Sequence, residues 1–240
     1  MEMMPPEDWA GMDYLVTEFH KRFQPLDEGD MVRILAIDPL LTTVSITAAV
    51  GGASTAQTNN PHPCPNGTGF QLGQGQFCDV HIRGGARIEA TGRILVGQFM
   101  KVNAATGSGD PSFVLVTPTA RMRCGHRFYS FDGFPVDVPP LPDTPYNGTY
   151  VNIVAPSADI DSVLLDGQTL ISGLTCLDYT RTDYAPPSDY SWARCRLVDP
   201  PAGGQQHVLA SQPVDDERVA AYAYGQHPFG AYSYPTGVGF

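Results

Sequence analysis

Two short His/Cys pairs are the residues in this sequence whose types and spacing best fit metal chemistry. His62 and Cys64 are separated by one residue, and Cys78 and His81 by two. Two thiolates and two imidazoles form the ligand set of a tetrahedral zinc site. Their order does not follow a common zinc-ribbon pattern, however, and the same cysteines are good candidates for bonding to each other. We therefore expect a disulfide here, with zinc at His62, Cys64, Cys78 and His81 as the alternative.

The cysteines predict two disulfides and one unpaired thiol. The chain has five, at Cys64, Cys78, Cys124, Cys176 and Cys195. Sequence alone allows several connectivities, and the simplest joins nearest neighbours, Cys64 to Cys78 and Cys176 to Cys195. Each bridge would close a loop of about 15–20 residues and contribute roughly 3 kcal/mol in the chain-entropy model. Cys124 is then a buried free thiol or the site of an intermolecular link.

Two sequons and two tyrosines mark candidate surface sites. Asn66 and Asn147 each begin an Asn-Gly-Thr sequence in a turn-like stretch, so both are candidate N-glycosylation sites in a secreted protein. Tyr232 and Tyr234 lie in a turn-rich segment near the C-terminus. Aromatic side chains of this kind contact sugars or protein partners, so these two residues form a candidate ligand surface.

Catalytic templates are absent from the sequence. It contains no G-x-S-x-G elbow, P-loop or H-E-x-x-H motif, and we predict no catalytic and no cofactor-binding residue. Asp159-x-Asp161 and Asp215-Asp216-Glu217 lack the glycine and terminal glutamate of an EF-hand loop, so acidic turns explain them. The alternative is a secreted hydrolase whose site is scattered in sequence, which a Ser–His–Asp cluster in a cleft would favour.

Composition limits the class of protein and its partners. The 240 residues are 42% hydrophobic, enough for a sizeable core, while 25 glycines and 22 prolines favour many short strands. The net charge of −11 argues against nucleic acid as the main partner. No apolar run reaches the roughly 18 residues of a membrane span. The acidic, proline-bearing start does not resemble a signal peptide, so we expect a fragment of a larger protein.

Strand signals dominate after residue 30. Runs rich in β-branched residues predict strands, and Asp166-Gly167 predicts a hairpin turn. The predicted strands cover 31–37, 42–48, 70–82, 86–100, 112–118, 150–156, the hairpin 163–170, 193–198, 207–211 and 219–224. The segment 7–23 has apolar residues near helical spacing and taken alone predicts a helix.

The two halves of the chain share a loose pattern. Each has a strand that ends at a proline, a cysteine-flanked loop and a final apolar strand. We therefore expect an all-β fold of antiparallel sheets in two related sub-units, residues 1–140 and 141–240, or one continuous domain. A sandwich-like arrangement is preferred, and a propeller-like arrangement of repeated sheets is the alternative.

Several segments together resemble the N-terminal IgG Fc-binding domain family. They occur in the family's order: WAGMDYLV at 9–16, ILVGQFM at 94–100, DPSF at 110–113, YVNIVAP at 150–156, LDG at 165–167, AYAYG at 221–225 and YSYPTG at 232–237. Arg93 stands where the family pattern has proline. The resemblance implies the C-terminal part of such a domain, with a strand rather than a helix at 9–16.

This resemblance implies a non-enzymatic extracellular or cell-surface module for binding or adhesion. We expect it to engage a protein or glycan as part of a larger secreted or surface protein. IgG binding itself cannot be carried over, because no Fc-contacting residue of the family can be mapped to this chain. A structural spacer without a ligand is a further alternative.

Overall fold

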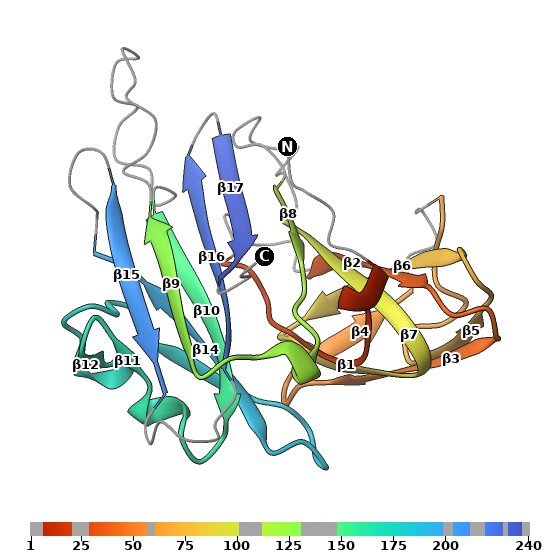
Figure 1. The fold of residues 1–240 in the computed structure, drawn as a ribbon, viewed down its shortest axis with the longest axis horizontal. Helices are drawn as coiled ribbons and strands as arrows, with labels where there is room; N and C mark the ends of the chain where they lie inside the picture. The colour runs from red at the N-terminus through yellow and green to blue at the C-terminus, as the bar shows by residue number, and fades with distance from the viewer. Residues whose placement is uncertain are drawn as a thin grey trace.

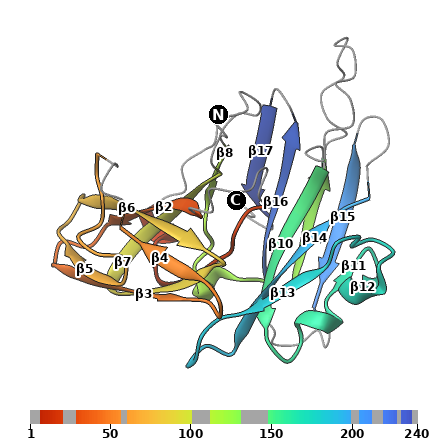
Figure 2. The ribbon, with the colours of Figure 1, turned by 180° about the vertical axis from the view of Figure 1, so that it is seen from behind.

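The fold is built almost entirely from antiparallel strands. The computed structural model describes residues 7–20, 29–56, 61–100, 112–130, 148–198, 204–211, 219–227 and 230–236. These residues form strands β1–β17 and four short 3-10 helices: η1 (Glu7–Trp9), η2 (Thr119–Arg121), η3 (Ile160–Ser162) and η4 (Leu170–Ser172). Figures 1 and 2 show a curled sheet on one side of the molecule and two stacked sheets on the other.

The first sheet curls around the long strand β7. It contains β1 (Gly11–Val16), β2 (Asp30–Ala36), β3 (Thr42–Ala48), β4 (Ala53–Thr55), β5 (Gly69–Leu72), β6 (Phe77–Arg83), β7 (Ala86–Met100) and β8 (Ser112–Leu115), in the order β4-β6-β2-β7-β3-β5 with β1 and β8 also on β7. The first half of β7 pairs with β1 and β3, and its second half pairs with β2 and β8. This change of neighbours bends the sheet into a half-barrel around an apolar core.

The other two sheets pack face to face. The five-stranded sheet has the order β13 (Thr180–Asp183), β14 (Tyr190–Arg196), β10 (Gly148–Pro156), β16 (Ala220–His227) and β17 (Gly230–Pro235). The four-stranded sheet has the order β12 (Gln168–Thr169), β11 (Leu164–Leu165), β15 (Gln205–Ala210) and β9 (Gly125–Ser130). A second apolar core lies between them.

The central strand of the five-stranded sheet, β10, is buried on both faces. Along β10, Val151 and Ile153 join the core shared with the four-stranded sheet, whereas Tyr150 and Val154 join the core of the first sheet. Residues alternate between the two faces of a strand, so β10 needs apolar residues on both sides. The five-stranded sheet is therefore the middle layer of the molecule.

A buried polar seam joins this middle layer to the first sheet. The Asn152 amide donates to Thr17 Oγ1 and to the Glu18 carbonyl, both at 2.9 Å, and accepts from the Tyr224 hydroxyl at 3.1 Å. Trp192 Nε1 donates to the Gly84 carbonyl at 3.0 Å. Buried polar groups need such partners, so these bonds fix how the two layers meet.

The structure confirms the expected all-β, antiparallel fold class, and its stacked sheets fit a sandwich. It also confirms a strand at the N-terminal segment, because β1 occupies 11–16, and the helix that periodicity alone suggested there is wrong. The predicted run 70–82 is divided into β5 and β6 by a turn. The division into sub-units at residue 140 stays a prediction, although β9 precedes it and pairs with β15 from the second half.

Candidate functional site

A short loop after the β11–β12 hairpin exposes an unusual number of large apolar side chains. Ile171 is 61% exposed, Leu174 65% and Leu177 47%, and Val198, next to the loop, is 47% exposed. We call residues 171–178 the apolar loop. Single exposed apolar residues are ordinary, but several within one short segment mark a candidate interaction surface.

A disulfide fixes the apolar loop to the middle sheet. Cys176 is bonded to Cys195 of β14, and both residues are fully buried. The backbone of Cys176 also forms an isolated antiparallel β-bridge with Leu197. The Leu177 amide donates to the Arg196 carbonyl at 2.8 Å. At the other end, Leu170 of η4 is buried in the second core. The loop is therefore attached at its start and near its end while its apolar side chains face outward.

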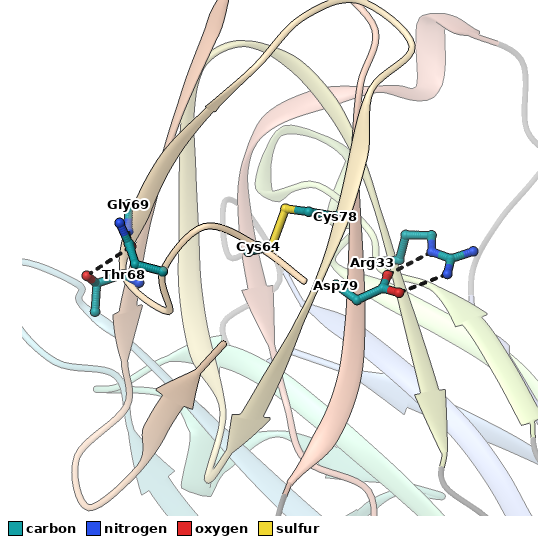
Figure 3. The surroundings of a disulfide bond; sticks show 7 residues. Arg33, Cys64, Thr68, Gly69, Cys78 and Asp79 are labelled. Carbon is teal, nitrogen blue, oxygen red and sulfur yellow. Dashed lines mark hydrogen bonds and ion pairs between the residues drawn. A yellow bond between two sulfur atoms is a disulfide. The ribbon is translucent and has the colours of Figure 1, made fainter. Parts of the chain in front are cut away.

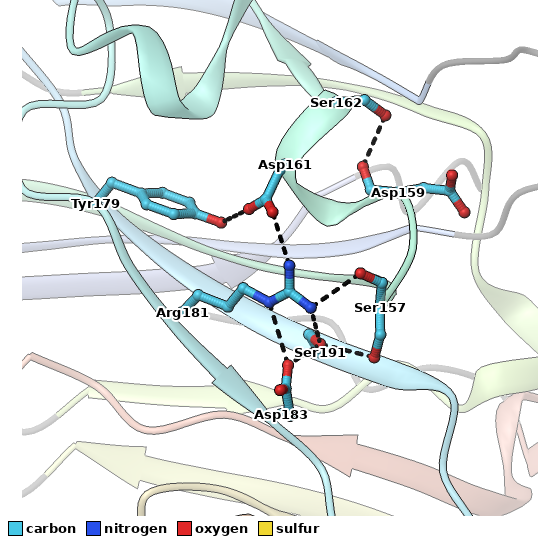
Figure 4. Close-up of polar contacts among 8 residues, drawn as sticks. All are labelled: Ser157, Asp159, Asp161, Ser162, Tyr179, Arg181, Asp183 and Ser191. Carbon is cyan, nitrogen blue, oxygen red and sulfur yellow. Dashed lines mark hydrogen bonds and ion pairs between the residues drawn. The ribbon is translucent and has the colours of Figure 1, made fainter.

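A polar network holds the chain where it leaves the loop. Arg181 of β13 lies at the centre of Figure 4, and its guanidinium bonds Asp161 Oδ2 at 2.7 Å, Asp183 Oδ1 at 3.1 Å and the Ser157 carbonyl at 2.9 Å. The Tyr179 hydroxyl donates to Asp161. These contacts join β13 to the segment around η3, so the exit of the loop is fixed as well.

The titration of this network follows from its contacts. Burial, reinforced by the hydrogen bond to Asp161, raises the pKa of Tyr179 well above its usual value. The hydrogen bond from Ser191 and then the contacts with Arg181 lower the pKa of Asp183. At neutral pH the network therefore keeps a protonated tyrosine, a charged arginine and a charged Asp183.

Such a loop is suited to binding rather than to catalysis. Its large exposed side chains, Ile171, Leu174 and Leu177, are aliphatic and carry no nucleophile, acid or base. Because the loop is already ordered, a partner would not have to pay much of the entropy of fixing it. Aliphatic groups of this kind form the apolar centre of protein interfaces.

The first disulfide occupies the position of the alternative zinc site. Cys64 is bonded to Cys78, and the nearby Arg33 of β2 forms a two-bond ion pair with Asp79 of β6 at 2.8 and 2.9 Å (Figure 3). Sulfur atoms bonded to each other are not thiolate ligands. Among the residues that the structure describes, no group of three or more His, Cys, Asp or Glu side chains is placed to hold a metal ion.

The structure describes only some of the other predicted sites. Asn66 is exposed in the first disulfide loop, and its Oδ1 accepts from the Thr68 and Gly69 amides at 3.0 and 2.6 Å. Asn147 and the acidic run 215–217 lie outside the described residues. Asp161 belongs to the Arg181 network. Glycosylation at either asparagine stays a prediction.

Tyr232 and Tyr234 lie on the edge strand β17. The Tyr234 hydroxyl bonds the backbone N–H and carbonyl of Tyr129 on β9, and the Tyr232 hydroxyl donates to Thr149 Oγ1 at 3.4 Å. Both hydroxyls therefore connect strands within the protein, and a ligand contact at these rings stays a prediction. Cys124 is an exposed free cysteine, so the expectation of a buried thiol is wrong and the intermolecular link stays a prediction.

One cluster was not identified by sequence reasoning. Ser130 Oγ lies 2.8 Å from His207 Nε2, and His207 Nδ1 lies 2.7 Å from Asp166 Oδ2. This is the order of contacts in a serine-hydrolase triad. Ser130 is 0% exposed and His207 4% exposed, however, so a substrate cannot reach the hydroxyl in this conformation. The cluster instead connects β9, β15 and the β11–β12 turn by hydrogen bonds. These three elements are far apart in the sequence, so no motif could predict the cluster.

The fold and this surface define an all-β module that contains disulfides and presents an ordered apolar loop. The family model described as IgGFc binding protein matches residues 1–234. The chain therefore belongs to the IgGFc-binding protein family, a family of binding domains. Neither the search of curated proteins nor that of solved structures found a match. Among the described residues, no helix is long and apolar enough to cross a membrane.

Proposed function

We propose that the chain is a non-enzymatic extracellular module that binds a protein through the apolar loop, as part of a larger secreted or surface protein. The observation that carries this proposal is the exposure of Ile171, Leu174 and Leu177 in a segment fixed by a disulfide and by the Arg181 network. Burying one exposed leucine against a partner is worth roughly 1.5–3 kcal/mol. Three such side chains supply the apolar centre of a specific interface.

Two further observations support the setting and the kind of partner. The two disulfides fit an oxidising compartment, as expected outside the cell. Aliphatic side chains offer no flat ring on which a sugar can stack, so the loop favours a protein over a glycan. The family description names the Fc part of IgG, and Fc is therefore the protein ligand that we propose first.

Surface plasmon resonance with immobilised Fc, and with Fab as a reference, tests this proposal. Leu174→Asp places a charge in the centre of the loop. We expect it to weaken Fc binding at least about tenfold, because a tenfold change needs only about 1.4 kcal/mol. The matched control is Leu40→Asp, since Leu40 is 77% exposed in the turn between β2 and β3. It should bind Fc like the unchanged chain.

Two results would contradict the proposal. Equal Fc binding by the Leu174→Asp variant and the unchanged chain would remove the loop from the interface. An unchanged chain that binds Fc no better than Fab would exclude Fc as the ligand and favour a structural spacer.

A further inference from the structure

Two arginines lie side by side on the face of β14 that turns toward the first sheet. Arg194 and Arg196 alternate with Cys195, so their side chains leave the same face of the strand. Asn152 is opposite Arg194 and Tyr150 is opposite Arg196 on the neighbouring strand β10. Both arginines are partly buried. Two guanidinium groups are therefore held close to the seam between the layers.

His20 adds an imidazole to this cluster. Its ring stacks on the Tyr150 ring, with centroids 4.5 Å apart, and its backbone N–H donates to the Tyr224 hydroxyl at 2.9 Å. Burial, followed by repulsion from Arg194, lowers the pKa of His20 to about 4. The imidazole is thus neutral at neutral pH, and the two guanidinium groups carry the positive charge of the cluster.

Neither arginine forms a close ion pair with a described carboxylate. Among the described residues Arg194 has no ion-pair partner, and Arg196 Nη1 lies 3.9 Å from Asp178 Oδ2, whose side chain is 71% exposed. The Arg196 Nε–H group is buried and donates a hydrogen bond to no described atom. By contrast, Arg33 and Arg181 pair with carboxylates at 2.8 and 2.7 Å. The Arg196 side chain is 36% exposed, so its guanidinium is accessible, and an anion bound here would supply a close charged partner.

We propose that Arg194 and Arg196 form a binding site for an oxyanion group, a carboxylate or a sulfate, beside His20. The planar guanidinium presents paired N–H donors that match two oxygens of such a group. The Leu177 amide bonds the Arg196 carbonyl, so the site borders the apolar loop. It does not depend on the function proposed for that loop, since small anions alone are expected to bind.

Titration of the full chain with sodium sulfate or sodium acetate, followed by NMR, tests this site. Chloride keeps the ionic strength constant and serves as the reference. We expect saturable shifts of the Arg194 and Arg196 Nε–H resonances. We also expect the pKa of His20 to rise by roughly one unit or more, as for a base that gains a nearby opposite charge. The stronger of the two titrations identifies sulfate or carboxylate as the preferred group.

Variants connect the response to these residues. Arg194→Gln and Arg196→Gln should each abolish saturable anion binding. Arg194→Lys keeps the positive charge and should only weaken the binding, so it serves as a control for misfolding. Arg127→Gln, at an exposed position of β9, should leave it unchanged. The proposal would be overturned if the shifts rose linearly with anion concentration without saturating. It would also be overturned if the Arg194→Gln and Arg196→Gln variants, with intact amide spectra, responded like the unchanged chain.

Discussion

Replacing Asn152 with alanine tests whether the buried polar seam holds the layers of this structure together. Asn152 is fully buried, and its amide serves Thr17, Glu18 and Tyr224. Alanine would leave a buried carbonyl and two hydroxyls without this partner. A buried polar group left unpaired costs about 1–3 kcal/mol, so three incompletely additive penalties predict a loss of roughly 3–5 kcal/mol. That is a large part of the roughly 5–15 kcal/mol of a typical domain.

Urea unfolding followed by tryptophan fluorescence and by circular dichroism measures this loss. Trp192, one of the two tryptophans of the chain, lies at the same junction of the layers. Part of the tryptophan fluorescence therefore reports on the seam, while circular dichroism reports on all strands. Tyr224→Phe should cost less, because it removes a single hydroxyl. Gln71→Ala is the control, since its amide is exposed and makes a bond of 3.2 Å to Thr43; it should change stability by less than about 0.5 kcal/mol. A loss below about 1 kcal/mol for Asn152→Ala would refute the reasoning.

Four other predictions follow from the same structure. Joint replacement of Cys176 and Cys195 by alanine should lower the unfolding free energy by roughly 3 kcal/mol and weaken Fc binding, as thermal unfolding and surface plasmon resonance would show. Ser130 should not react with a fluorophosphonate in the native protein, because it is buried; a mass increase at Ser130 would instead favour the hydrolase alternative. The folded pKa of His20, about 4, lies below the ordinary 6.5, so the unfolded chain binds more protons between these values. Stability should therefore fall as pH falls through that range, and His20→Gln should reduce the slope in urea titrations. Residues 141–240 expressed alone should show no cooperative unfolding by circular dichroism, because one face of the middle sheet would lose its cover.

Strand positions were the most predictable part of the fold. The predicted ranges 42–48 and 86–100 coincide with β3 and β7, because alternating β-branched residues suit a strand with one buried face. What could not be predicted is that the two halves of β7 pair with different strands, which bends the first sheet. Pairing partners depend on contacts between distant residues, and a local pattern does not contain them.

The candidate site was harder to predict than the fold. Leu170, the last residue of the predicted hairpin, is buried, whereas the next residue, Ile171, is exposed. The direction of each side chain depends on η4 and on the Cys176 disulfide. The network of Arg181 with Asp161 likewise joins residues 20 positions apart. The sequence predicted the Cys176–Cys195 disulfide correctly. It contained no signal for which residues near Cys176 would be exposed to solvent.

The burial of the middle sheet explains where binding can occur. Because β10 contributes to a core on each side, a substitution along it disturbs packing instead of creating a surface. Surfaces for partners are consequently restricted to outer sheet faces, edges and loops. The apolar loop and the arginines of β14 both lie where the middle sheet meets such a loop, joined by the bond between Leu177 and Arg196. A partner that carries an acidic group beside an apolar one could contact both, so Arg196→Gln should weaken a protein complex that Leu174→Asp also weakens.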